Sequence, residues 1–421
     1  MSESETNTST SDIKNMGSHV FSPSDPTLIP SYGSPLVQSS EGLFDPFSIG
    51  QNPSLNQIFR ASPQEDFQLT DYSNGEAALD ANWLFYNYMG IWGDSAWYTQ
   101  DALNNDIVLM AKHKQGCQFL QNILIGKDPC GTKIIFEGVL ECIVDLMSHP
   151  SGNYIFQRLV EVCSIDQLQE IVLRITRERG ALIHAAVDHF GTRSVQKLVK
   201  MTKKLPLITY VISALAPGIL ALMLNQTGSH VIRHCLVHLD SQQNRVIFEV
   251  AVKYCLRLAT HEQGCVSLNN CIDCIKDPHR KQLINMISVN AVQLSQDPFG
   301  NYVVQRVLAL QNPEFTKIIC YQLQGYYVLL SMQKCGSHVV EKCLKSPWIS
   351  NIVNEFLAND KLVQLARDPF GNYVIQTALK YTKVMHYGLY QLLVIVLQPH
   401  LSDLQYHPNG RNIFKFINGS I

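Results

Sequence analysis

The sequence lacks most features of a secreted, fibrous or wholly disordered protein. Charged residues make up only 16% of the 421 positions and hydrophobic residues 46%, which excludes wholesale disorder and a collagen-like fibre. The opening stretch MSESETNTSTSDIKN has no basic segment followed by an apolar one, so it does not resemble a secretory signal. We therefore expect a cytoplasmic protein whose twelve cysteines are mostly buried, reduced thiols.

Metal and membrane signatures are also weak. Cys271 and Cys274 form a CxxC within CIDC, but no second pair follows at zinc spacing, so we expect neither a metal nor another cofactor. Residues 205–224 carry no charge and have the length of a membrane span, yet a Pro-Gly step lies in their middle. That step predicts two short buried helices and no membrane contact.

Basic residues are scarce in the first 104 positions, which hold only Lys14 and Arg60 against 13 acidic residues, a balance of 2 − 13 = −11. The remainder holds 33 − 2 = 31 basic and 35 − 13 = 22 acidic residues, a balance of +9. This asymmetry favours a polyanionic partner for the C-terminal part. Residues 1–76, rich in Ser, Thr, Asn and Pro, are expected to be a disordered acidic tail, and residues 77–104, with clustered aromatics, an N-terminal cap.

What the sequence has in abundance is self-similarity. Eight short segments begin with glycine: GCQFLQ, GNYIFQ, GTRSVQ, GSHVIR, GCVSLN, GNYVVQ, GSHVVE and GNYVIQ, starting at Gly116, Gly152, Gly191, Gly228, Gly264, Gly300, Gly336 and Gly371. Their period of about 36 residues indicates a solenoid. The flanking segments lack alternating apolar and polar residues, so the fold class is all-α, with two or three helices per unit. Asp-Pro steps before two of the glycines are expected to end a helix, and the glycine to let the chain turn.

Polar groups recur in register after each glycine. With the glycine as position 0, positions 1 and 5 share a helix face while positions 3 and 4 point to the core. The position 1 and 5 pairs are Cys117 with Gln121, Asn153 with Gln157, Thr192 with Gln196, Ser229 with Arg233, Cys265 with Asn269, Asn301 with Gln305, Ser337 with Glu341 and Asn372 with Gln376. Position 2 holds Gln118, Tyr154, Arg193, His230, Val266, Tyr302, His338 and Tyr373.

This pattern has the chemistry of a face that binds unstacked bases. Amides, hydroxyls and a carboxylate can hydrogen-bond base edges, and Tyr, His or Arg side chains can stack on base faces. The alternative is a solvated helix face, but such a face tends to fill with Lys and Glu, whereas here the Asn-Tyr-Gln set recurs three times. The pattern therefore favours recognition of unstacked bases over a face that is merely solvated.

These residues resemble the repeats of the Pumilio (PUF) family, from about Asn105 to the C-terminus. The resemblance implies a crescent-shaped, right-handed solenoid of eight three-helix repeats over residues 105–397, with a degenerate cap over 398–421 around HPNGRNIFKFI. It also implies that the concave face binds single-stranded RNA antiparallel to the protein, one base per repeat. The position 1 and 5 pairs would then contact base edges. The stacking residues would be Tyr154, Arg193, His230, Tyr302, His338 and Tyr373.

The resemblance further implies a base for most repeats. The three Asn and Gln pairs would read U, Ser337 with Glu341 would read G, and the pairs containing Gln121 and Gln196 would read A. From the eighth repeat this gives UGU, two undefined bases, then A, U and A. The fourth and fifth repeats depart from the family pattern through Arg233 and through the short Asn269, so we expect relaxed discrimination there.

By resemblance, the protein would bind UGU-containing elements in mRNA 3′ untranslated regions and regulate translation and mRNA stability, by recruiting deadenylase or repressor proteins. We expect a monomer with no enzymatic activity, since no nucleophile, base and orienting acid come together and GKDPCGTK departs from a phosphate loop. Two alternatives remain open. One is a nucleolar Pumilio-like protein that binds RNA with low sequence specificity in ribosome biogenesis, and the other is a protein-binding scaffold of the HEAT or armadillo type.

Overall fold

The computed structural model describes residues 100–419, with side chains from residue 104 onward. All of them fall in one compact unit. The expected tail and nearly all of the expected aromatic cap lie outside the described residues. Between residues 100 and 419 the chain forms α-helices and short 3-10 helices and no strand, which confirms the all-α prediction for this part.

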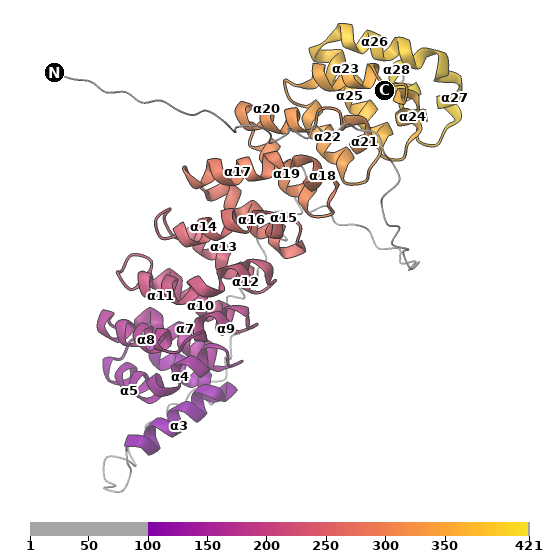
Figure 1. Cartoon of the computed structure of the whole chain (residues 1–421). Helices are drawn as coiled ribbons and strands as arrows, with labels where there is room; N and C mark the ends of the chain where they lie inside the picture. The colour runs from indigo at the N-terminus through magenta and orange to yellow at the C-terminus, as the bar shows by residue number, and fades with distance from the viewer. Residues whose placement is uncertain (1–99, 420–421) are drawn as a thin grey trace, which may run out of the picture. The chain divides into compact units, whose positions relative to one another are not determined.

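The helices follow one another in chain order from α3 to α28 (Figure 1). In each repeat we distinguish a first helix before the recurrent glycine, a second helix that contains or begins at it, and a third helix after it. The first four repeats comprise α3 (Gln100–Lys112), α4 (Lys114–Gly126) and α5 (Pro129–Val139); η1 (Leu140–Cys142) with α6 (Ile143–Met147), α7 (Gly152–Val162) and α8 (Ile165–Arg177); α9 (Ala181–Val187), α10 (Gly191–Thr202) and α11 (Ile208–Leu215); and η2 (Ala216–Gly218) with α12 (Ile219–Leu224), α13 (Gly228–His238) and α14 (Arg245–Lys253).

The second half repeats this arrangement. It comprises α15 (Cys255–Ala259), α16 (Glu262–Cys274) and α17 (His279–Val289); α18 (Ala291–Gln296), α19 (Gly300–Ala309) and α20 (Pro313–Gln322); α21 (Tyr327–Ser331), α22 (Gly336–Leu344) and α23 (Ile349–Leu357); and α24 (Leu362–Arg367), α25 (Gly371–Met385) and α26 (Tyr387–Leu397). A shorter unit of η3 (Gln398–His400), α27 (Leu401–Tyr406) and α28 (Arg411–Ile417) follows, at the position of the expected C-terminal cap.

One continuous hydrophobic core runs through the repeats. Positions 3 and 4 of the second helices in the second and sixth repeats lie in it, as the sequence predicts: Ile155, Phe156, Val303 and Val304 are fully buried. Each such side chain contributes roughly 1.5–3 kcal/mol through burial. Position 1 is also buried in every repeat, whereas position 2 and most position 5 side chains are at least partly exposed.

The recurrent glycine has a different role from the expected turn. Gly300 and Gly336 do not have a left-handed backbone. Instead, a Cβ at Gly300 would lie 2.8 Å from the carbonyl oxygen of Leu294, and one at Gly336 would lie 2.6 Å from that of Leu330. The glycine is therefore needed because the second helix begins against the backbone of the first helix, at a distance that no side chain tolerates.

A residue three positions before the glycine stabilises the start of several second helices. The Oδ1 atom of Asp297 accepts hydrogen bonds from the backbone N–H groups of Phe299, at 2.9 Å, and Gly300, at 2.7 Å. Asp368 does the same for Phe370 and Gly371, each at 2.8 Å. These bonds satisfy N–H groups that lack a partner within the helix. The Asp-Pro steps also end the preceding helices, α18 and α24, as predicted.

The uncharged stretch at 205–224 forms α11, η2 and α12, which confirms the prediction of two short helices. Val211, Leu215 and Leu222 of this stretch are buried in the solenoid core. Within residues 100–419 no single helix is long and apolar enough to cross a membrane; only one bent pair, Ile208–Leu224 with Gly228–His238 at 116°, meets the criteria of length and composition.

Candidate nucleic-acid interface

The predicted base-edge residues all lie on second helices, and these helices pack against one another in series. α7 contacts α4 and α10, α13 contacts α10 and α16, and α19, α22 and α25 continue the series. The second helices therefore form one row (Figure 1). Each of them contributes one set of residues at positions 1, 2 and 5 to that row.

In the three repeats with an Asn and Gln pair, the two amides contact each other directly. The Nε2 atom of Gln157 donates to the Oδ1 atom of Asn153 at 3.0 Å. The same bond, 2.9 Å long, recurs in the sixth and eighth repeats, where the pairs are Gln305 with Asn301 and Gln376 with Asn372. These helical i, i+4 contacts fix the orientation of the glutamine amide.

The asparagine of each such pair is buried, and both N–H groups of its amide are occupied. Asn153 is 1% exposed, and its Nδ2 atom donates to the carbonyl oxygens of His149, at 2.9 Å, and Pro150, at 2.8 Å. Asn301 and Asn372 make the corresponding pairs of bonds. The glutamine in each pair is half-buried, and it keeps one N–H and its carbonyl oxygen for a ligand. A donor beside an acceptor matches the N3–H and carbonyl groups of uracil.

The first and third repeats present a similar glutamine with a different partner. The amide of Gln121 donates to the Cys117 sulfur at 3.3 Å, and that of Gln196 donates to the Thr192 hydroxyl at 3.2 Å. The thiol of Cys117 donates to the carbonyl oxygen of Ser151, and burial raises the pKa of this thiol. Cys117 is therefore a neutral thiol beside the Gln121 amide at neutral pH.

The seventh repeat carries the only acidic residue among the position 1 and 5 pairs. The side chain of Glu341 is 24% exposed, and one of its oxygens lies 3.9 Å from Nδ1 of His338. Its other oxygen accepts a hydrogen bond from the hydroxyl of Thr377, at 3.2 Å, in the second helix of the eighth repeat. Ser337 donates to the carbonyl oxygen of Lys334. A partly exposed carboxylate can accept from adjacent N–H donors of a ligand, which guanine possesses and uracil does not.

The fourth repeat has no amide at either position. The hydroxyl of Ser229 donates to the carbonyl oxygen of Gln226, at 2.7 Å, within the same helix start. Arg233 at position 5 is exposed. A guanidinium group only donates hydrogen bonds, so this repeat lacks the combination of donor and acceptor that the glutamines offer.

In the fifth repeat, the side chains at positions 1 and 5 are both buried. The thiol of Cys265 donates to the carbonyl oxygen of Glu262, at 3.1 Å. Asn269 is 5% exposed, and both polar atoms of its amide are buried without a hydrogen-bond partner. The fifth repeat therefore offers no accessible amide edge at position 5. We expect relaxed discrimination in this repeat because the Asn269 side chain is short, and the burial of its amide acts in the same direction.

Most of the predicted stacking residues are accessible. Tyr373 is 57% exposed and the side chain of His338 61% exposed. Tyr154, Arg193 and His230 are exposed as well, and Tyr302 is half-buried. Partial desolvation of the imidazole ring, with a smaller effect of the neighbouring Arg233, holds the pKa of His230 below its usual value. That imidazole is accordingly neutral at pH 7, when it can stack without adding charge.

Two ion pairs between consecutive second helices were not anticipated from the sequence. Lys197 of α10 pairs with Glu161 of α7, and Nε of Arg306 in α19 donates to Asp273 of α16 at 2.8 Å. In both, position 6 of one repeat meets position 9 of the preceding repeat. The recurrence of opposite charges at this spacing is the signal that could have revealed them.

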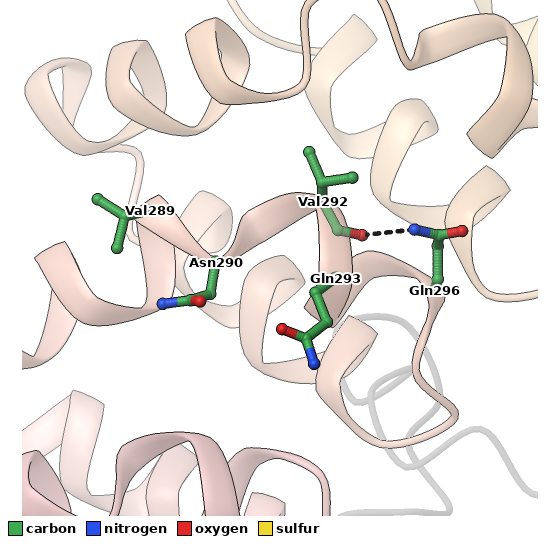
Figure 2. Close-up of a pocket in the computed structure, with 5 residues that line it drawn as sticks. All are labelled: Val289, Asn290, Val292, Gln293 and Gln296. Atoms are coloured by element: carbon green, nitrogen blue, oxygen red, sulfur yellow. Dashed lines mark hydrogen bonds between the residues drawn. The ribbon is translucent and has the colours of Figure 1, made fainter. Parts of the chain in front are cut away.

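No metal cluster accompanies the predicted residues in the part of the chain that the structure describes. Within residues 100–419 no group of three or more His, Cys, Asp or Glu side chains could hold a metal ion. The twelve cysteines are free thiols, and Cys271 of the CxxC is buried. An open hollow of about 470 Å³ is lined by Val289, Asn290, Val292, Gln293 and Gln296 (Figure 2). It lies where α17 meets α18 and contains none of the predicted site residues.

Comparison with known proteins gives one consistent family. The sequence profile described as "PUF: Pumilio-family RNA binding repeat" matches residues 106–125, 142–176, 218–250, 254–288, 290–323, 326–346 and 361–383. The third repeat lies outside the matched ranges, although its helix α10 contacts α7 and α13 like any other second helix. The structure thus places Thr192 and Gln196 in the row where the profile finds no repeat.

Curated relatives carry the same family name. Pumilio homolog 12 of Arabidopsis thaliana is 42% identical over 315 residues, which cover 74% of this chain and 52% of the relative. Putative pumilio homolog 7, chloroplastic, of Arabidopsis thaliana is 43% identical over 310 residues, which cover 73% of this chain and 47% of the relative. The chain spans about half the length of the curated relatives it matches.

Solved structures share the fold. The Puf4 RNA-binding domain bound to the HO endonuclease RNA 3′ UTR recognition sequence is 29% identical, with a TM-score of 0.67 over 76% of this chain and 99% of that one. A mutant of the Puf4 domain bound to the Cox17 RNA 3′ UTR recognition sequence is 30% identical, with a TM-score of 0.67 over 74% of this chain and 98% of that one. These matches confirm the predicted solenoid of Pumilio repeats.

Proposed function

Because the chain belongs to the Pumilio (PUF) family of RNA-binding repeat proteins, we propose that it binds single-stranded RNA sequence-specifically through the position 1 and 5 pairs of its second helices. The observation that carries this proposal is the repeated Gln-to-Asn bond, which orients the amides of Gln157, Gln305 and Gln376 on one row of helices. A scaffold of the HEAT or armadillo type would have no need for the same oriented amide in equivalent repeats.

The proposed sequence preference follows the pairs from the eighth repeat to the first: U, G, U, two loosely read bases, A, U and A. The glutamines of the Asn and Gln pairs supply a donor and an acceptor to uracil, and Glu341 accepts from N1–H and N2–H of guanine. The exposed Arg233 and the buried amide of Asn269 support weak discrimination in the middle of the site. Each well-made base contact contributes roughly 1–3 kcal/mol of discrimination.

The physiological targets in this proposal are UGU-containing elements in mRNA 3′ untranslated regions. The two Puf4 domain structures are titled with 3′ UTR recognition sequences, which supports this target class. Bound to such an element, the protein regulates translation and mRNA stability as a cytoplasmic, non-enzymatic monomer that recruits deadenylase or repressor proteins. Localising the tagged chain tests the compartment, because the name of one relative includes "chloroplastic".

Fluorescence anisotropy tests the proposal directly. The full chain is titrated into labelled UGUAAAUA and into ACAAAAUA at near-physiological salt. We expect tight binding to the first octamer and a loss of at least about a hundredfold for the second, since three base contacts are removed. Equal affinity for both would contradict sequence-specific recognition and favour a general RNA binder. Binding to neither would favour a protein partner.

A charge-removing substitution then tests the guanine contact. Glu341→Gln should reduce the preference for UGU over UAU octamers by about tenfold or more, because an amide cannot accept from both guanine N–H groups. Glu249→Gln, the same chemical change on the exposed third helix α14, is the matched control and should leave the preference unchanged. A guanine preference that survives Glu341→Gln would show that this repeat does not read the base as proposed.

A further inference from the structure

The hydroxyl of Thr377 belongs to the eighth repeat but contacts the proposed guanine reader of the seventh. Its Oγ1 atom donates to Oε2 of Glu341 at 3.2 Å. Both side chains are half-buried, and the bond joins residues 36 positions apart, one repeat along the row. Thr377 is not at position 1, 2 or 5 of its helix, so the base-reading pattern gives it no role.

The choice of acceptor is unusual for a helical threonine. Thr176, Thr202 and Thr382 each donate to the backbone carbonyl four residues earlier, at 2.6–2.8 Å, which is the common arrangement. Thr377 instead directs its hydroxyl across the repeat boundary to the Glu341 carboxylate. The side chain is therefore held in the rotamer that reaches the carboxylate and not in the one that serves its own helix.

The chemistry of position 6 makes this contact distinctive. At two other boundaries, position 6 is a cation that pairs with a carboxylate at position 9 of the preceding repeat: Lys197 with Glu161 and Arg306 with Asp273. Between the seventh and eighth repeats, position 6 is instead Thr377, whose neutral hydroxyl contacts the carboxylate of Glu341 at position 5. A cation there would neutralise the carboxylate and compete for its lone pairs, whereas a hydroxyl orients one oxygen and leaves the negative charge available to a ligand.

We infer that Thr377 is a positioning residue that sets the specificity of the seventh repeat for guanine by orienting the Glu341 carboxylate from the neighbouring repeat. This inference rests on the proposed function, because it presupposes that Glu341 reads a base. Oε2 has lone pairs for both Thr377 and a base N–H, so the bond to Thr377 persists when RNA binds. The base read by the seventh repeat thus depends on a side chain of the eighth.

The test compares guanine discrimination in three variants of the full chain. Thr377→Val removes the donor with little change in shape, Thr377→Ser retains the hydroxyl, and Thr382→Val removes a helix-internal hydroxyl from the same helix. Dissociation constants are measured for UGUAAAUA, for UAUAAAUA, and for UGAAAAUA, in which the third base, assigned to the sixth repeat, is altered. We expect Thr377→Val to lower the preference for G over A by about fivefold to tenfold.

The same variant should leave the preference at the third base unchanged, and Thr377→Ser and Thr382→Val should retain wild-type discrimination at both bases. If Thr377→Val keeps the full guanine preference, or weakens all octamers to the same degree, Thr377 is only structural and the inference is wrong. If the wild-type chain itself shows no preference for G over A, the proposal that Glu341 recognises guanine is wrong, whatever the effect of Thr377→Val. The wild-type ratio therefore separates the two failures.

Discussion

At the scale of single residues, position 5 carries the accessible hydrogen-bonding groups and position 1 holds them in place. The amide nitrogens of Asn153 and Asn301 are used up by backbone carbonyls, so the glutamines paired with them remain available to a ligand. Buried polar groups must be paired, and in these repeats the pairing also orients the glutamine amide. Asn269 breaks this rule, because both of its amide atoms are buried and unpartnered.

Lengthening Asn269 should restore a reader in the fifth repeat. With Cys265 at position 1, Asn269→Gln would recreate the pair of the first repeat, where the Gln121 amide donates to the Cys117 sulfur. We expect the preference for A at the fourth base of the octamer to rise by about fivefold or more. Anisotropy titrations with all four bases at that position measure the change.

The reverse substitution, Gln121→Asn, is the matched control and should reduce discrimination at the last base. If the Asn269→Gln variant binds all four octamers equally, the length of this side chain is not the only feature that prevents the fifth repeat from contacting the base.

At the scale of helices, each second helix begins against the first helix of its repeat, and this contact sets where positions 1, 2 and 5 lie. The 36-residue recurrence of glycine predicted the repeats, and the lack of alternating apolar and polar residues predicted helices, so burial of positions 3 and 4 followed from the period of an α-helix. The reason for the glycine was not predictable in the same way. It depends on the distance to the Leu294 backbone, which only the packed structure contains.

A methyl group at the glycine should therefore destabilise the repeat. Gly300→Ala would bring Cβ within 2.8 Å of the Leu294 carbonyl oxygen, so we expect a loss of about 1–3 kcal/mol of stability as the two helices separate. Gly388→Ala in α26 is the control, since no atom lies within 4 Å of the new Cβ and alanine has the higher helix propensity. Thermal unfolding should show a lower midpoint for Gly300→Ala and an unchanged or higher one for Gly388→Ala. Equal midpoints would mean that close approach does not explain the recurrence.

At the scale of the whole repeat array, each second helix contacts its neighbours in the series, so energetic effects should be local. This locality explains why the sequence predicted the position 1 and 5 pairs but not the partners between repeats. A pair such as Asn301 and Gln305 lies within one helical turn and is visible in the pattern. The contact of Thr377 with Glu341 crosses a repeat boundary, and the identities of the two residues do not predict it.

Locality makes a quantitative prediction about double substitutions. Glu341→Gln and Gln121→Ala affect repeats at opposite ends of the array, so their effects on the binding free energy of UGUAAAUA should add within about 0.5 kcal/mol. Glu341→Gln and Thr377→Val remove two halves of one contact, so together they should cost less than the sum, by about 1 kcal/mol. Anisotropy titrations of the single and double variants give both cycles. Strong coupling between the distant pair, as large as that between the neighbours, would show that the repeats bind RNA as one rigid unit and not as a series of local readers.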